Sequence, residues 1–206
     1  MLEGIAAGTM QVMETYREIA DWNPVVTLLR EAATELADVA ARMDEAALEP
    51  ALEAITSARR IMLFGNGREG LMMQALGMRL YHLGRDICMQ GDMEAFPLGP
   101  GDLFLCAAGP GETSTASALC GVATAAGARV LVVTAEPAGA TSVMADDLLI
   151  IPAQTMARDV GGASVLPMGS LFEGAMFLVF EVLILKLRDT FGETAETMRA
   201  RHTNME

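Results

Sequence analysis

The stretch Arg60-Ile-Met-Leu-Phe-Gly-Asn-Gly-Arg-Glu-Gly70 decides the fold of this chain. Its apolar residues Ile61 to Phe64 predict a buried strand, and Gly65 and Gly67 then allow backbone φ values that a Cβ would resist. Apolar residues recur at helical spacing afterwards, so a strand, a tight turn and a helix follow within about twenty residues. Such a helix directs unpaired backbone N–H groups beyond the sheet edge, which favours an anionic ligand, although many α/β proteins use a glycine turn only to change direction.

The alternation of strand and helix continues along the chain. Short apolar runs bounded by Gly, Pro or Asp predict four further strands, at residues 86–89, 102–107, 129–134 and 148–151. Helical patterns separate most of them, notably at residues 113–126. Runs buried on both faces and joined by helical crossovers predict a parallel sheet between two layers of helices. Ligands bind such sheets beyond the carboxyl ends of the strands, which here are followed by residues 65–70, 107–115 and 134–137.

Helices are predicted on both sides of this region. Amphipathic patterns before it predict three helices, over residues 1–20, about 23–40 and 49–57. A loop with little periodicity covers residues 153–167, includes Gly161-Gly162 and is long enough to suggest a functional role. Two helices follow, at residues 169–187 and 193–201. We therefore expect a single domain made of a helical lead-in, a parallel α/β core and a region of loop and C-terminal helices, at residues 1–58, 59–152 and 153–206.

Composition argues against several classes of function. The 206 residues are 52% hydrophobic, which suffices for a full-sized core, and the net charge of −13 without any basic run argues against nucleic-acid binding. No secretory signal is expected, and the longest apolar run, residues 175–187, is interrupted by Glu181 and Lys186, so no membrane span is expected either. The three cysteines lack metal-ligand spacing and are predicted to be reduced core thiols of a cytoplasmic protein without a metal site.

A second glycine turn repeats the geometry of the first. The segment Ala108-Gly-Pro-Gly-Glu-Thr-Ser-Thr115 follows a predicted strand and opens a predicted helix. Thr113 and Ser114 place hydroxyl groups at the start of that helix, where they can contact an anion or only cap the helix. Two such turns at one edge of a sheet favour a ligand site.

Three side chains are candidates for chemistry. Glu173 lies in the first turn of a strongly apolar helix, which is typical of a general base and equally of a carboxylate that the helix dipole stabilises. His202 lies in a polar tail and by itself is an ordinary solvated histidine. Arg68 can meet an anion at the first turn or form an exposed salt bridge.

Five motifs carry a resemblance to a known family. They are Phe64-Gly-Asn-Gly-Arg-Glu-Gly70, Met78-Arg-Leu-Tyr-His-Leu-Gly84, Gly109-Pro-Gly-Glu-Thr113, Pro167-Met-Gly-Ser-Leu-Phe-Glu173 and Arg201-His-Thr-Asn-Met-Glu206. With these motifs in this order, nearly the whole chain resembles the 6-phospho-3-hexuloisomerase family of sugar isomerase (SIS) domains. The last two motifs are the specific ones, because glycine turns occur throughout SIS proteins.

This resemblance implies a five-stranded parallel sheet in a three-layer α/β/α sandwich, assembled as a tetramer or dimer with active sites where subunits meet. It implies interconversion of a 3-hexulose 6-phosphate and fructose 6-phosphate without a metal or organic cofactor. Glu173 would take the proton from C2, giving an enediolate that is reprotonated at C3, and His202 of a neighbouring subunit would assist ring opening or move protons between oxygens. The substrate would lie against both turns, at Gly65, Asn66, Gly67, Arg68, Glu69, Gly109, Gly111, Glu112, Thr113 and Ser114.

The chain departs from the family pattern at both turns. It carries Glu69, Ala108 and Pro110 where family members typically have serine. A carboxylate within about 4–6 Å of a phosphate is unfavourable unless it turns away, is protonated or pairs with a cation such as Arg68, and Pro110 removes a backbone N–H. Three hypotheses follow: an isomerase of a sugar phosphate, an isomerase of a free sugar or sugar acid, and a non-catalytic SIS module that binds a sugar derivative.

Overall fold

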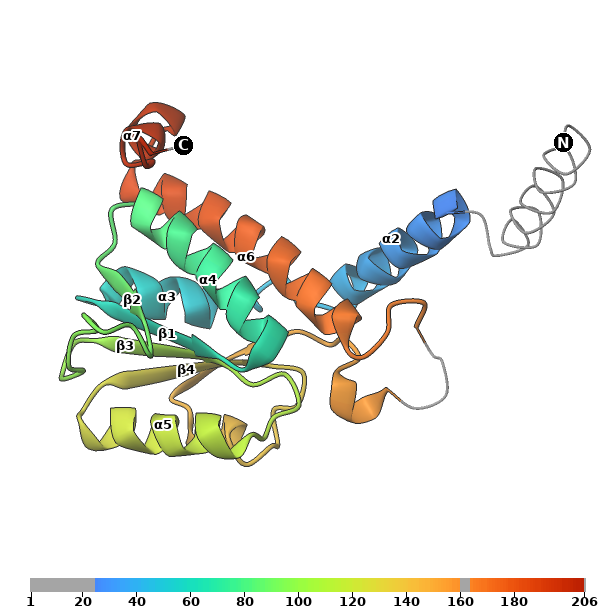
Figure 1. Ribbon diagram of the computed structural model, residues 1–206, viewed down its shortest axis with the longest axis horizontal. Helices are drawn as coiled ribbons and strands as arrows, with labels where there is room; N and C mark the ends of the chain where they lie inside the picture. Colours follow the sequence, from blue (N-terminus) through green and yellow to red (C-terminus); the bar gives the residue numbers. More distant parts are fainter. Residues whose placement is uncertain (1–24, 160–163, 206) are drawn as a thin grey trace, which may run out of the picture.

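A computed structural model describes residues 25–159 and 164–205, and it has a parallel sheet between two layers of helices (Figure 1). The helix predicted over residues 1–20 and the pair Gly161-Gly162 lie outside the described residues. The sheet has five strands in the order β2-β1-β3-β4-β5, and every neighbouring pair is parallel. The predicted α/β/α sandwich is confirmed.

The strands lie where the apolar runs predicted them. Their bounds are β1 Ile61–Gly65, β2 Ile87–Met89, β3 Leu103–Ala107, β4 Arg129–Thr134 and β5 Asp147–Ile150. In the register of β1 and β3, Gly65 lies opposite Ala107, so both strands end side by side. Because β2 pairs with the other edge of β1, the winding of the sheet reverses between β1 and β3. Open α/β sheets bind ligands at such a reversal point, beyond the carboxyl ends of the strands.

Helices cover both faces of the sheet (Figure 1). Their bounds are α2 Val25–Ala41, α3 Glu49–Ser57, α4 Gly67–His82, α5 Ser114–Ala125, α6 Ser170–Phe191 and α7 Ala195–Ala200, with 3-10 helices at Ser142–Met144 and Met156–Arg158. Alternate strand residues serve two cores: Leu63 packs in the core with α3, α4 and α6, whereas Met62 packs in the core with α5. This two-sided burial explains why the strands are apolar throughout. The second core also contains the three cysteines, which are free and buried as predicted.

Between residues 177 and 185, helix α6 carries exposed apolar side chains in addition to its buried ones. It continues beyond the predicted end at residue 187 to Phe191 and stops at Gly192, whose φ of 67° suits glycine. Leu183 and Leu187 are buried, whereas Phe177, Leu178, Val182 and Leu185 are exposed. In the part of the chain that the structure describes, no helix combines the length and apolarity needed to cross a membrane.

The strand–turn–helix junction depends on three glycines for two different reasons. Gly67 has a φ of 53°, as the sequence predicted for the turn. Gly65 does not have a positive φ, so the expectation for that residue was wrong. A Cβ on Gly65 would lie 2.8 Å from the Gly70 nitrogen, and a Cβ on Gly70 would lie 2.5 Å from the Gly65 oxygen. Close backbone contact, rather than an unusual φ, therefore requires glycine at positions 65 and 70.

Candidate active site

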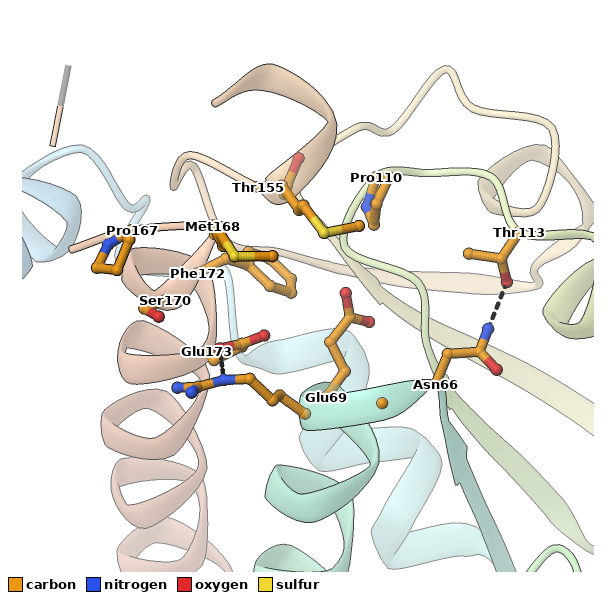
Figure 2. Close-up of a pocket in the computed structure, with 14 residues that line it drawn as sticks. Asn66, Glu69, Pro110, Thr113, Thr155, Pro167, Met168, Ser170, Phe172 and Glu173 are labelled. Carbon is orange, nitrogen blue, oxygen red and sulfur yellow. Dashed lines mark hydrogen bonds and ion pairs between the residues drawn. The ribbon is translucent and has the colours of Figure 1, made fainter. Parts of the chain in front are cut away.

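A cavity lies beyond the ends of β1 and β3, where α4 and α6 begin (Figure 2). Its volume of about 420 Å³ is within the range of small-molecule sites. Four segments line it: the first glycine turn, the second glycine turn, the loop after β5 and the first turn of α6. The lining residues are Asn66, Gly67, Arg68, Glu69, Pro110, Thr113, Thr155, Met156, Pro167, Met168, Gly169, Ser170, Phe172 and Glu173.

Glu173 reaches this cavity from the first turn of α6. The helix begins after Gly169, whose φ is 81° and whose Cβ, if present, would lie 2.5 Å from the Met156 nitrogen. The Glu173 side chain is only 13% exposed, and Arg68 Nε donates a 2.5 Å hydrogen bond to its Oε2. The Arg68 side chain is 65% exposed, so its guanidinium compensates the carboxylate while remaining open to solvent. The position of Arg68 is thus compatible with both roles that the sequence predicted for it, a salt bridge and contact with an anion.

Glu69 lies across the same cavity on α4 and contacts the second turn. Its Oε2 accepts a 3.0 Å hydrogen bond from the Gly109 N–H. The pKa of Glu69 is raised to about 7, chiefly by burial; the Gly109 hydrogen bond lowers it and the charge of Glu173 raises it. Arg68, which the sequence suggested as a compensating cation for Glu69, instead pairs with Glu173.

Thr113 joins the two turns. Its hydroxyl oxygen accepts a hydrogen bond from the Ala116 N–H at 3.2 Å, which makes it the N-cap of α5, and another from Asn66 Nδ2 at 2.8 Å (Figure 2). With these two bonds accepted, the Thr113 hydroxyl can act toward a ligand in the cavity only as a donor. Thr113 therefore caps helix α5, which was one of the two roles that the sequence allowed, and its hydroxyl group can still donate a hydrogen bond to a ligand.

Other predicted binding residues shape the turns without lining the cavity. Gly111 has a φ of 78°, and a Cβ there would lie 2.6 Å from the Cβ of Glu136. A Cβ on Gly109 would lie 2.6 Å from the Phe172 ring and 2.7 Å from Glu69 Oε1. Glu112 is exposed and lines a neighbouring hollow with Glu136 and Arg158. Gly65 forms the junction described above, and Ser114 is exposed at the start of α5 outside the cavity lining.

The loop after β5 supplies lining residues that the sequence did not identify individually. Thr155 is only 3% exposed, and its hydroxyl oxygen has no hydrogen-bond partner within the described residues. Met168 has a φ of 55°, and its N–H donates to Asp159 Oδ2 at 2.7 Å. The missing periodicity of residues 153–167 suggested a functional loop without distinguishing Thr155, whereas Met168 lies in the motif Pro167–Glu173 that the sequence identified.

His202 lies at the opposite end of α4 from the cavity. Its ring centroid is 5.3 Å from that of His82, the last residue of α4, whereas Glu69 lies in the first turn of the same helix. His82 follows Glu69 by thirteen positions of the helix, roughly 20 Å along the axis. The chain therefore does not bring its own His202 to Glu173. Across the described residues, no group of three or more His, Cys, Asp or Glu side chains is placed to hold a metal ion.

Comparison with known proteins identifies the relatives of this chain. No protein-family model matches it. It is 32% identical to the 3-hexulose-6-phosphate isomerase of Bacillus subtilis over 177 residues, which cover 85% of this chain and 96% of that protein. The chain belongs to the 3-hexulose-6-phosphate isomerase family. Another member of this family, from Mycobacterium gastri, is 34% identical over 172 residues, covering 84% of this chain and 86% of that protein.

Solved structures agree with the fold of the 3-hexulose-6-phosphate isomerase family. A hypothetical protein superposes with a TM-score of 0.80 at 23% identity, covering 88% of this chain and 97% of that one. A Methanococcus jannaschii protein, whose structure infers a molecular function of 3-hexulose-6-phosphate isomerase, has a TM-score of 0.75 at 21% identity, covering 86% and 98%. These structures agree with the fold, and the sequence relatives above confirm the family resemblance.

Proposed function

We propose that this chain is a sugar-phosphate isomerase that interconverts a 3-hexulose 6-phosphate and fructose 6-phosphate. Membership of the 3-hexulose-6-phosphate isomerase family supports the reaction class. The single observation that carries the proposal is Glu173, a nearly buried carboxylate that faces a cavity of small-molecule size. A carboxylate shielded from water in this way is suited to removing a proton from a carbon next to a carbonyl group.

The reaction needs one base that acts on two neighbouring carbons. Glu173 takes the proton from C2 of the 3-ketose, and the electron pair of the broken C–H bond forms the C2–C3 double bond of an enediolate. The same carboxyl group then returns a proton to C3, and the carbonyl group forms at C2 as the proton on the C2 oxygen moves to the C3 oxygen. Arg68 holds the Glu173 carboxylate in one place through the 2.5 Å hydrogen bond, which limits its motion between the two steps.

The charges of the lining residues bear on how a phosphorylated substrate enters. Among the lining residues, all of which the structure describes, Arg68 is the only cation, and Glu69 and Glu173 are the only acids. With both acids ionised the lining carries a net charge of −1, which opposes a phosphate monoester. With Glu69 protonated the net charge is zero. We therefore infer that sugar phosphate binds the form in which Glu69 is neutral.

A partner subunit would complete the site by supplying His202. Exposed apolar side chains gather on the two helices that flank the cavity: Leu71, Met78 and Tyr81 on α4, and Phe177, Leu178, Val182 and Leu185 on α6. We call these seven residues the α4/α6 apolar surface. A two-fold contact in which the α4 and α6 helices of the two subunits run antiparallel would place the far end of α4 of one subunit near the cavity of the other. This arrangement supports the predicted homo-oligomer with shared active sites.

A second candidate is an isomerase of a free sugar or sugar acid. The observation in its favour is that Glu69 already occupies the Gly109 N–H, a donor that an anionic substrate group would otherwise use. Turnover of phosphorylated and free sugars, compared for the wild type and Glu69→Ser, separates the two candidates. Phosphosugar binding that appears only in Glu69→Ser supports the second candidate. Equal phosphosugar affinity in both proteins below pH 7, where Glu69 is protonated, supports the first.

Glu173→Gln tests the proposed function. Removal of a general base lowers the rate about 10²–10⁴-fold, and we expect this loss in kcat together with the loss of exchange between the C2 hydrogen and solvent deuterium. Glu45→Gln, at an exposed position outside the cavity, is the matched control and should retain wild-type kcat. A fully active Glu173→Gln would remove Glu173 as the base. A wild-type protein that binds sugars without turning any over would establish the non-catalytic module instead.

A further inference from the structure

We propose that Glu69 is a second catalytic acid–base group, which moves a proton between the two substrate oxygens while Glu173 moves a proton between the two carbons. This inference rests on the proposed isomerase function and assigns a role to a residue at which family members typically carry serine. It requires that Glu69 reach the substrate, that its carboxyl group be available in the protonated form and that the proton transfers balance.

Glu69 meets the first requirement by its position. Glu69 and Glu173 line the same cavity from the first turns of α4 and α6, and their carboxyl groups interact electrostatically. Figure 2 shows the Glu173 carboxyl group below Met168 and Phe172, and the Glu69 carboxyl group beside Phe172, directed toward Pro110. A substrate that places a C–H bond against Glu173 can therefore present its neighbouring oxygens to the side of the cavity that Glu69 forms.

The surroundings of the two carboxyl groups differ in the way that an acid–base pair requires. Glu173 is held by the Arg68 guanidinium, whereas Glu69 is held by an uncharged backbone N–H. Glu69 Oε2 accepts that hydrogen bond, and Oε1 has no hydrogen-bond partner in the part of the chain that the structure describes. Oε1 is therefore free to carry the proton. One carboxyl group that is held by a cation, beside another that is held by an uncharged donor, is an arrangement typical of a base and an acid acting together.

One charged group, together with burial and the Gly109 hydrogen bond, acts on the titration of Glu69. Glu173 on α6 raises the pKa of Glu69 through its negative charge, in addition to the larger effect of burial. Arg68, adjacent to Glu69 on α4, is engaged by Glu173. Cys106 on β3 interacts with Glu69, but its hydrogen bond to Cys120 and its burial raise the pKa of its thiol far above the usual range, so Cys106 stays neutral. Glu69 is thus half-protonated near pH 7, where an acid–base catalyst is most effective.

The proton transfers balance over one turnover. As Glu173 removes the proton from C2, Glu69 donates its proton to the oxygen on C3, and the neutral enediol forms. Glu69, now ionised, takes the proton from the oxygen on C2 while Glu173 returns its proton to C3. The carbonyl group has moved from C3 to C2, and both carboxyl groups have regained their starting protonation states. No oxidant, reductant or other reactant is needed.

Glu69→Gln keeps an oxygen that can accept the hydrogen bond of the Gly109 N–H and removes the ionisable carboxyl group, so it tests the proposal directly. We expect kcat to fall about 100-fold or more, with KM for the sugar phosphate unchanged or lower, because the variant is neutral at every pH. In the wild type, kcat/KM should fall as pH rises through 7, since the acid form is lost, and this decline should be absent in Glu69→Gln. Glu69→Asp should recover part of the rate, because it restores a carboxyl group.

Two outcomes separate this proposal from the one on which it rests. A wild-type enzyme with isomerase activity, combined with a Glu69→Gln variant of equal kcat or with an unchanged decline above pH 7, overturns the role of Glu69 alone. A wild-type protein with no isomerase activity overturns the proposed function and this inference together. If Glu69→Gln does not fold, Glu69→Ser, which carries the side chain typical of the family, should show the same loss of kcat and of the alkaline decline.

Discussion

Thr155 carries a buried hydroxyl group that the folded chain leaves without a hydrogen-bond partner within the described residues. An unpaired buried polar group costs about 1–3 kcal/mol of stability. Thr155 lines the cavity that also contains Glu69 and Glu173. We therefore expect a substrate hydroxyl to complete the hydrogen bonding of Thr155 when the site is occupied.

Thr155→Val should have opposite effects on stability and on binding. Because valine has nearly the same shape and no hydroxyl, the free energy of unfolding should rise by about 1 kcal/mol and the variant should unfold at a higher temperature than the wild type. KM for the substrate should rise roughly tenfold, because the hydrogen bond to the substrate is lost. Thermal unfolding and steady-state kinetics measure the two effects. Thr134→Val is the contrasting control: the Thr134 hydroxyl is buried and accepts a 2.9 Å hydrogen bond from the Glu136 N–H, so that variant should lose stability. A destabilised Thr155→Val with unchanged KM would contradict the role of Thr155.

Glu69 should make the stability of the protein fall as pH rises. Its pKa is raised from 4.5 to about 7 in the folded state, so the folded state binds the proton more tightly than the unfolded state does. This contribution is fully present below pH 4.5 and is lost as pH rises through 7. The shift corresponds to about 3 kcal/mol, at 1.36 kcal/mol for each pKa unit.

The glutamine variant isolates this effect from all other titrations. Near pH 4.5 the free energies of unfolding of Glu69→Gln and the wild type should be similar, and above pH 7 Glu69→Gln should be the more stable by up to about 3 kcal/mol. Urea unfolding at several pH values provides the measurement. Glu45→Gln, at an exposed position outside the cavity, should keep the wild-type decline of stability with pH. A difference for Glu69→Gln that stays constant with pH would show that Glu69 is not perturbed.

At the scale of elements, the junction between β1 and α4 is the most constrained part of the fold. The backbones of Gly65 and Gly70 touch across the turn, and this contact sets where α4 begins relative to the sheet. Arg68 and Glu69 are carried on this first turn of α4, so their positions over the cavity depend on the same contact.

Gly70→Ala should destabilise the protein although glycine is a poor helix former. The added Cβ would lie 2.5 Å from the Gly65 oxygen, so the backbone must shift, at a cost of about 1–3 kcal/mol. Gly121→Ala in α5 is the matched control, since its Cβ meets only Met144 Cε at 3.7 Å and the helix gains up to about 1 kcal/mol from alanine. Denaturant unfolding should therefore move in opposite directions for the two variants. A stabilised Gly70→Ala would show that the junction can relax.

At the scale of the whole molecule, the chain separates its two predicted catalytic residues. Glu173 lies at the start of α6 and His202 lies near the end of α4, beyond α7. The α4/α6 apolar surface extends along the helices between these two regions. A second copy of the chain packed against this surface would cover the apolar side chains. It would also bring its own His202 toward the cavity of the first copy.

Mixing two inactive variants tests this arrangement. If each site takes Glu173 from one subunit and His202 from another, Glu173→Gln and His202→Ala should each be impaired, and activity should partly return when their subunits exchange, because some sites then receive both native residues. Activity after co-refolding is the measurement. Glu173→Gln mixed with Glu173→Ala is the control and should remain inactive. Mixed oligomers that form without any recovery would place His202 outside the site.

The sequence by itself determined the sheet, its helical layers and the place of the cavity. Apolar runs such as Ile61 to Phe64, joined by glycine turns, restrict the chain locally to strands buried on both faces and connected by helices. The sequence also predicted that the glycine turns after β1 and β3 lie side by side, because parallel strands end at the same edge of the sheet.

Only the tertiary structure decided which charged groups meet. Arg68 pairs with Glu173, 105 positions away, rather than with neighbouring Glu69, and Glu69 turns to the Gly109 N–H, 40 positions away. Thr155 likewise lines the cavity because the loop after β5 passes beside it. These contacts depend on how distant segments pack, and because burial and long-range pairing control the charge of a carboxyl group, no local pattern predicts them.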